Sequence, residues 1–223
     1  MSSARRPAFD KLPGDERLSA AILSDSLDAA GLRAQVLRSR LAPLVAGSRI
    51  LGRAWTVAFE PSIDDNPADP YGAAIDYISA IGAGEIAVIA TDESNESALW
   101  GELFSAAALG AGALGVITDG NLRDTDKIAS LGFPAFSRSR RPIDYRMRMR
   151  VVGVGEPVRL GGVSIAAGDL VMADDDGVVV IPQSSEVEVL RRARERAAGE
   201  STVLSELLAG ETLRQVWDRH GIL

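Results

Sequence analysis

Apolar residues recur at two different spacings along the first third of the chain. Up to Gly31 they follow a helical period, which predicts a first helix. Residues 49–59 have the pattern of a strand, and residues 71–81 return to a helical pattern that ends at glycines. The polar segment Asp64 to Pro70 between them predicts a loop. The apolar positions of the first helix are Leu18, Ala21, Ile22, Leu27 and Ala30.

Two short apolar runs follow, Ile86 to Ala90 and Leu114 to Ile117, each bounded by turn residues. The stretch between them, residues 97–109, is rich in alanine and leucine and predicts a helix. Strand, helix and strand in this order indicate a parallel βαβ unit. Residues 123–131 then predict a short helix, and residues 133–136 a further strand.

Beyond residue 150, short β-type runs joined by glycine-rich turns predict a small β layer packed on the α/β part. The chain then closes with helical patterns over residues 186–208, where Gly199 is the expected breaking point, and over residues 212–219. The whole chain, 1–223, is therefore expected to form one α/β domain. Residues 1–14 are expected to be a mobile segment, and residues 184–223 to form C-terminal helices. The four β-type runs are residues 151–160, 163–165, 170–173 and 178–181.

Charge and hydropathy narrow the classes of partner. The formal net charge is -7 and no segment concentrates enough basic residues to follow a phosphate backbone, so nucleic acid is not an expected partner. The arginines of residues 191–196 alternate with Glu188, Glu195 and Glu200, which favours a solvated, salt-bridged helix face. No apolar run is long enough to cross a membrane, and residues 1–14 lack the apolar core of a secretory signal. We therefore expect a cytoplasmic protein.

Elimination limits the chemistry further. The chain has no cysteine, which excludes disulfides, thiolate nucleophiles and zinc–thiolate sites. His220, the only histidine, lies near the C-terminus, where an exposed position is expected. The two lysines, Lys11 and Lys127, are expected in a mobile segment and on a charged helix, which disfavours a Schiff base. Carboxylates, arginines, backbone amides and a hard metal ion such as magnesium or manganese remain.

The segment from Gly115 to Asp126 carries the strongest candidate residues. An apolar strand is expected to end in an Asp119–Gly120 turn and to lead into a helix with Arg123 and Asp124 near its start. At such a strand end an arginine can bind a carboxylate in a bidentate manner, and a neighbouring aspartate can hold a metal. The alternative is that Asp124 only caps the helix and Arg123 is a surface residue. The spacing alone favours that alternative.

Two further segments contain candidate groups. Gly101, at the head of a helical stretch, could let a ligand approach the backbone, and Glu102 beside it could serve a metal or a proton transfer. Taken alone, Glu102 is more simply an exposed glutamate of an amphipathic helix. Three aspartates, residues 174–176, precede Gly177. Their spacing does not fit a calcium loop and favours a hairpin turn between two strands.

Taken in order, these segments resemble the RraA-like family, which includes 4-hydroxy-4-methyl-2-oxoglutarate aldolases and regulators of ribonuclease E activity. The resemblance covers nearly the whole chain and implies a β/β/α swivelling-type fold. It also implies a homotrimer or dimer of trimers with active sites at subunit interfaces. The segments that carry it are residues 24–31, 52–57, 101–103, 119–124, 168–171, 174–180 and 221–223.

The resemblance also implies roles for particular residues. Asp124 would ligate Mg2+ or Mn2+, Arg123 would bind substrate, and Gly101, Glu102, Leu103 and Phe104 would line the substrate site. Catalysis would involve Arg123, Asp124 and Glu102. Two positions outside these segments also matter to the family pattern. Lys127 stands where that pattern continues with acidic residues, which bears on the metal–water contacts. Glu195 or Glu200 is the candidate for a C-terminal glutamate that a neighbouring subunit contributes.

The function implied is a divalent-metal-dependent lyase. It would cleave 4-hydroxy-4-methyl-2-oxoglutarate-like 2-oxo acids to pyruvate, and oxaloacetate decarboxylation would pass through the same enolate. The alternative is a non-catalytic regulator that binds a ribonuclease, because one scaffold carries both roles. A methyltransferase is disfavoured, since no glycine-rich nucleotide loop follows the first strand. Substrate selection is expected to involve the segments Ile63 to Tyr71 and Arg138 to Arg150.

Overall fold

The computed structural model describes residue 9 and residues 15–63 and 69–222. The N-terminal segment that the sequence predicts to be mobile, residues 1–14, therefore lies outside the described residues except for Phe9. Most of the predicted loop between Asp64 and Pro70 lies outside them as well.

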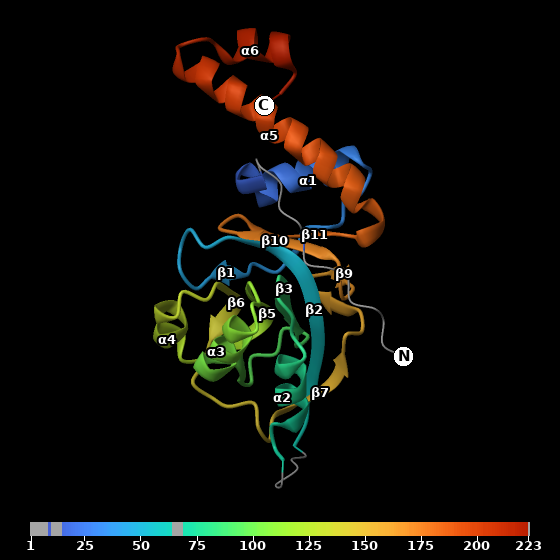
Figure 1. The fold of residues 1–223 in the computed structure, drawn as a ribbon, viewed down its shortest axis with the longest axis vertical. Coiled ribbons are helices and arrows are strands. Elements are labelled where there is room, and N and C mark those ends of the chain that lie inside the picture. Colours follow the sequence, from blue (N-terminus) through green and yellow to red (C-terminus); the bar gives the residue numbers. More distant parts are fainter. Residues whose placement is uncertain (1–8, 10–14, 64–68, 223) are drawn as a thin grey trace.

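A mixed sheet of nine strands forms the centre of the described residues (Figure 1). Its main path runs β1-β6-β5-β3-β2-β10-β11, while β4 pairs with β5 and β7 pairs with β2. The strands are β1 (Ala42–Pro43), β2 (Ile50–Pro61), β3 (Glu85–Ala90), β4 (Ala98–Trp100), β5 (Gly115–Leu122), β6 (Ala135–Arg140), β7 (Met149–Val154), β10 (Leu170–Asp174) and β11 (Gly177–Ile181).

The parallel half of this sheet confirms the predicted βαβ organisation. Strands β2, β3, β5 and β6 run parallel, and every residue of β3 is buried, as expected of a central strand in an apolar run. Three helices accompany these strands: α2 (Gly72–Ser79), α3 (Glu102–Gly110) and α4 (Thr125–Ser130). A core cluster that includes Ile78, Ala108 and Ile128 joins the helices to the sheet.

The prediction of a separate C-terminal β layer is only partly correct. β2 is twelve residues long, and on one edge its residues 50–53 pair with β10 and its residues 57–61 pair with β7, both antiparallel. These late strands therefore complete the main sheet. Only β8 (Val158–Leu160) and β9 (Val163–Ile165) form a sheet of their own. The predicted hairpin turn is confirmed, because Asp174 lies opposite Gly177 between β10 and β11.

Two helices cover the β10–β11 hairpin. α1 (Ala20–Ala29), capped by the Ser19 hydroxyl, and α5 (Glu186–Leu208) pack together and bury a shared apolar cluster against β10 and β11. A buried ion pair fixes the start of α5 to β2: Arg53 Nη1 lies 2.5 Å from Glu186 Oε2, and Nη2 lies 2.9 Å from Oε1. The cluster includes Leu23, Leu27, Met172, Val189 and Ala193.

The predicted break of α5 at Gly199 does not occur. The helix runs through this glycine, and the end of the Ile222 side chain packs where a Cβ at this position would lie. The predicted salt-bridged face of α5 is present, with Arg191 bound to both Glu188 and Glu195. No helix in the described part of the chain has the length and apolarity to cross a membrane.

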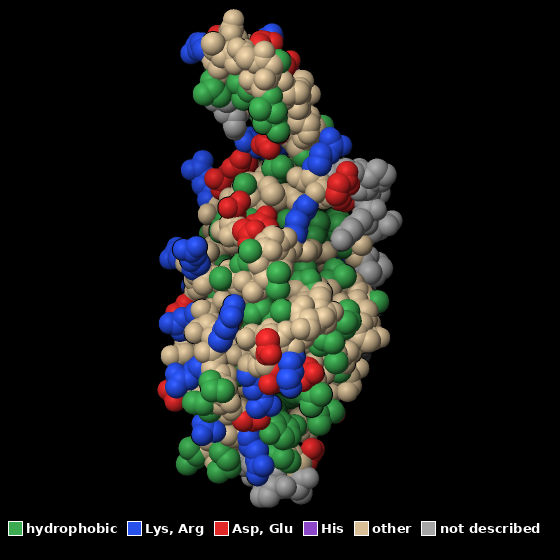
Figure 2. All heavy atoms as spheres, turned by 90° about the vertical axis from the view of Figure 1, so that its left-hand side faces the viewer, with side chains coloured by type: hydrophobic (Ala, Val, Ile, Leu, Met, Phe, Trp, Pro, Cys, Tyr) green, Lys and Arg blue, Asp and Glu red, His purple; other side chains and the backbone are tan. Residues whose placement is uncertain are grey.

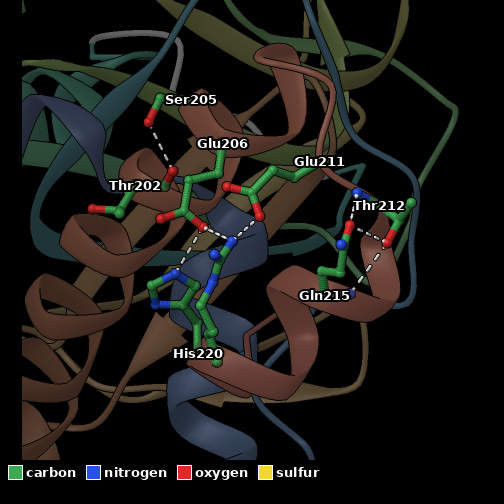
Figure 3. Close-up of polar contacts among 8 residues, drawn as sticks. Thr202, Ser205, Glu206, Glu211, Thr212, Gln215 and His220 are labelled. Carbon is green, nitrogen blue, oxygen red and sulfur yellow. Dashed lines mark hydrogen bonds and ion pairs between the residues drawn. The ribbon is translucent and has the colours of Figure 1, made fainter.

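The end of α5 and α6 (Leu213–His220) form a helical hairpin that projects from the sheet (Figures 1 and 3). Thr212 and Gln215 make a capping box at the start of α6. Glu206 joins the two helices by accepting from Arg219 Nη2 at 2.9 Å and contacting His220 Nε2 at 2.9 Å. The expectation that His220 is exposed is therefore wrong, since it is half-buried against Glu206.

Candidate functional site

A cavity of about 350 Å³ lies beside α3, at the ends of β4 and β5. It contains all the residues that the sequence nominates for the site: Gly101, Glu102, Leu103, Phe104, Arg123 and Asp124. Figure 2 shows the face that carries α4, where hydrophobic side chains gather in the lower half with arginine and lysine side chains among them. Ile75 and Leu103, which line the cavity, are 50% and 79% exposed.

The cavity floor begins with a strand that the sequence did not predict. Residues 98–100, expected as part of a helix, form β4, and α3 begins only after Gly101. The buried Trp100 fixes this junction, because its Nε1 donates to Ser105 Oγ at 2.7 Å. The Ser105 hydroxyl in turn donates to the carbonyl oxygen of Gly101 at 3.0 Å. The junction is thus held by side chains on both sides of the glycine.

The predicted turn at Asp119–Gly120 is wrong, because β5 continues through both residues to Leu122. The pairing of β5 with β6 shifts register between Thr118 and Asn121, so the Asp–Gly pair forms an irregularity inside the strand. Asp119 is buried and accepts the backbone N–H groups of Thr91 and Glu93 at 2.7 and 3.1 Å. Burial raises its pKa above the ordinary value, against the lowering effect of these bonds. Asp119 therefore anchors the loop after β3 and does not reach the cavity.

Asp124 occupies the N-cap position of α4 but does not act as a cap. Its backbone is left-handed, with φ 51° and ψ 38°, and its side chain accepts no capping hydrogen bond. The structure therefore contradicts the alternative that Asp124 merely caps the helix. Its side chain is 41% exposed. A Cβ at Gly101 would lie 2.9 Å from Asp124 Oδ2, so the glycine makes room for this carboxylate.

Arg123 is held by a carboxylate that the sequence did not nominate. Its Nη1 lies 2.7 Å from Oδ2 of Asp144, and the Tyr71 hydroxyl donates to the same oxygen at 3.0 Å. Burial acts to raise the pKa of Asp144. The Arg146 backbone N–H, the Tyr71 hydroxyl and the Arg123 guanidinium outweigh it, so the pKa falls below its ordinary value. Asp144 therefore stays ionised at neutral pH, and the stability it contributes is lost only as the pH falls through that lowered pKa.

Tyr71 and Asp144 come from the two segments, residues 63–71 and 138–150, in which the sequence places substrate selection. Arg123 is the only cationic residue among the described residues that line the cavity. Arg138 and Arg150 instead pair with Glu93 and Glu60. The feature of residues 138–150 that could have indicated Asp144 is that it is the only aspartate among several arginines.

Glu102 lines the cavity and is bound to Lys127, whose Nζ lies 3.0 Å from Glu102 Oε2. The hydrogen bond and charge of Glu102 raise the pKa of Lys127. Lys127 is exposed, as expected, and its ion pair with Glu102 links α4 to α3.

Glu195 and Glu200 pair with Arg191 and Arg196 on α5. Figure 1 places α5 at the far end of the molecule from α3 and α4, so a contribution from a neighbouring subunit stays a prediction.

The charge around Asp124 suits a divalent cation. Three carboxylates, those of Glu102, Asp124 and Asp144, face two cationic groups, those of Arg123 and Lys127, which leaves one net negative charge. Among the described residues, no three aspartate, glutamate or histidine side chains converge to hold an ion. An ion bound by Asp124 would thus be coordinated mostly by water or substrate oxygens, as Mg2+ usually is in proteins.

Comparisons with known proteins agree on one family. The sequence model of the RraA-like family, described as Aldolase/RraA, matches residues 20–180. A Halalkalibacterium halodurans protein, provisionally named a 4-hydroxy-4-methyl-2-oxoglutarate aldolase, is 31% identical over 79% of this chain and 78% of its own. Protein DlpA of Legionella pneumophila is 28% identical over 88% of this chain, but the match spans only 31% of that longer protein.

A solved structure shows the same fold. Streptomyces coelicolor RraAS2, described as an unusual member of the RNase ES inhibitor RraA protein family, matches with a TM-score of 0.77 and 27% identity. The match covers 86% of this chain and 96% of that one. Together, the family match over most of the chain and this shared fold establish that the protein belongs to the RraA-like family.

Proposed function

We propose that the protein is a divalent-metal-dependent carbon–carbon lyase that cleaves 4-hydroxy-4-methyl-2-oxoglutarate-like 2-oxo acids to pyruvate. The observation that carries the proposal is the arrangement of Asp124. Its carboxylate lies beside an arginine in a cavity, is not used as a helix cap, and belongs to a residue with a left-handed backbone. Such backbone conformations cost free energy in a non-glycine residue and concentrate at functional sites.

The residues around the cavity suit the binding of a pyruvoyl group. Gly101 has no side chain to cap α3, so the N–H groups of the first turn are available to a substrate carboxylate. A divalent ion at Asp124 would supply Lewis acidity to the keto and carboxylate oxygens. Arg123 would place positive charge beside the oxygen on which the enolate develops.

Retro-aldol cleavage then requires a proton acceptor. The substrate hydroxyl loses its proton, its oxygen becomes the carbonyl of one product, and the electrons of the broken C–C bond pass into the pyruvate enolate. We assign the acceptor role to Glu102, the carboxylate that lines the cavity beside Asp124, acting directly or through one water. Oxaloacetate decarboxylation would lead to the same enolate, so one site would support both reactions.

Pyruvate release tests this proposal. Oxaloacetate and 4-hydroxy-4-methyl-2-oxoglutarate would be incubated with the protein and Mg2+, and again with excess chelator. Turnover that chelator removes and Mg2+ restores is expected. No turnover of either substrate by folded protein would contradict the proposal. Binding to a ribonuclease without turnover would instead support the regulator alternative that the sequence left open.

Gly101→Ala gives a second test of the same geometry. The backbone of Gly101 is extended, so alanine is tolerated there, but its Cβ would press on Asp124 Oδ2 and on Arg123 Cγ, 3.1 Å away. Displacing this pair is expected to lower kcat/KM by roughly 10- to 100-fold. Gly110→Ala, on the same helix with open space around it, is the matched control. Equal activity of the two variants would show that the close approach at Gly101 is not needed.

A further inference from the structure

We propose that Asp144 and Tyr71 are positioning residues that fix the Arg123 guanidinium on the wall of the cavity. The catalytic part of this inference rests on the proposed lyase function, whereas the positioning itself does not. The three residues come from distant parts of the chain: Tyr71 precedes α2, Arg123 follows β5, and Asp144 lies between β6 and β7. Their meeting is therefore a property of the fold and not of a local motif.

Contacts other than the one with Arg123 also hold the Asp144 carboxylate in place. Its Oδ1 accepts the backbone N–H of Arg146 at 2.9 Å, which leaves Oδ2 for Arg123 and Tyr71. The Asp144 backbone forms a parallel bridge with Ala98 of β4, and the Ala98 N–H donates to the Ile143 carbonyl at 2.7 Å. The carboxylate is thus tied to the strand that leads into Gly101.

Tyr71 is also held on both sides. Its ring packs edge-on against Tyr145, with centroids 5.7 Å apart, and Tyr145 packs in the same way against Phe59 of β2 at 5.5 Å. The edge-on contacts from Phe59 through Tyr145 to Tyr71 therefore position the Tyr71 hydroxyl beside Asp144. Because the phenol donates to Asp144 Oδ2, burial and this carboxylate raise the pKa of Tyr71, and the hydroxyl keeps its proton.

The contact with Asp144 also determines how closely Arg123 can approach Asp124. Arg123 Nε lies 3.8 Å from Asp124 Oδ2, so a freely rotating guanidinium could close on the carboxylate that we assign to the metal. Asp144 binds Nη1 at 2.7 Å and holds the guanidinium away from that closer pairing. A guanidinium has five N–H donors in one plane, so fixing Nη1 orients the plane and leaves other donors for a substrate oxygen.

The first experiment measures the Arg123 side chain directly and needs no activity. The ¹⁵Nε–¹Hε signal of Arg123, identified by its loss in Arg123→Lys, would be recorded at mildly acid pH in the wild type and in Asp144→Asn and Tyr71→Phe. Both variants are expected to shift and broaden this signal. Asp76→Asn, which removes an exposed aspartate of α2, is the charge-matched control and should leave it unchanged. An unaltered signal in Asp144→Asn would overturn the proposal.

Kinetics with oxaloacetate then separate positioning from a merely structural role. Misplacing a catalytic group is expected to lower kcat roughly 100-fold in Asp144→Asn. The loss of one hydrogen bond to a charged group is expected to lower it about tenfold in Tyr71→Phe. KM should change little, and Asp144→Glu should recover part of the lost kcat. The urea unfolding midpoint should fall only by the small amount that one partly exposed ion pair contributes.

Different failures have different meanings. A fall in unfolding midpoint that parallels the fall in kcat would overturn the positioning role. A wild-type protein without turnover would refute the proposed function, while the Arg123 signal would still decide whether Asp144 and Tyr71 hold the guanidinium.

Discussion

Replacing Asp124 with asparagine is expected to lower pyruvate release by about 1,000-fold, because several kcal/mol of charge stabilisation depend on the ion it would hold. The variant should fold normally. The Asp124 side chain is 41% exposed and caps no helix, so its charge contributes little to stability. Asparagine also tolerates the left-handed backbone of this position better than most residues.

A binding measurement completes this test. Mg2+ should raise the thermal unfolding midpoint of the wild type, because a ligand that binds only the folded state stabilises it. The increase should disappear in Asp124→Asn and remain in Asp76→Asn, the exposed α2 control. Full pyruvate release by Asp124→Asn would refute the assignment of Asp124 as the metal ligand. The Mg2+ measurement tests the same assignment even if the protein has no lyase activity.

The largest loss of stability is expected from Glu186→Ala. Arg53 and Glu186 have side chains only 9% and 12% exposed and share two hydrogen bonds between β2 and the start of α5. Removing the glutamate leaves a buried guanidinium without its charged partner, which costs about 3–5 kcal/mol. Urea unfolding should show this as a lower midpoint.

Two variants test whether burial is the cause. Glu188→Ala removes a glutamate from the same helix, but the side chains of its partners Arg191 and Arg192 are 51% and 40% exposed, so the midpoint should change little. Replacing Arg53 and Glu186 together by methionine should recover most of the lost stability, because no unpaired charge remains. If Glu186→Ala behaved like Glu188→Ala, the ion pair would contribute nothing that depends on its burial.

The sequence predicts the periodic parts of this fold well. The apolar run at residues 86–90 and the helical spacing of residues 186–208 identify β3 and α5, because burial imposes a period on each. Pairing between distant strands leaves no such period. That is why the sequence assigns the late strands to a separate layer, whereas β10 lies beside β2 with Leu170 opposite Arg53.

The candidate site divides in the same way. Gly101, Arg123 and Asp124 lie in short motifs that can be recognised in the sequence. The sequence indicates only the segments that contain Asp144 and Tyr71, because these two residues join the site through tertiary contacts. The predicted turn at Asp119–Gly120 was wrong for a related reason. The usual turn preference of this pair is overridden because buried backbone N–H groups bind the aspartate.

The place of β2 in the sheet has a consequence for how the chain is made. Its pairing with β3 is available once residue 90 has been synthesised, but the partners of its opposite edge come later, β7 from Met149 and β10 from Leu170. On the ribosome, the part of this edge that pairs with β10 therefore stays unpaired while about 80 more residues are added, at a pace of several residues per second. During that interval the nascent chain exposes a strand edge of the kind that pairs with other chains. A folding defect in this protein should thus appear as aggregation of incomplete chains before it appears as instability of the finished one.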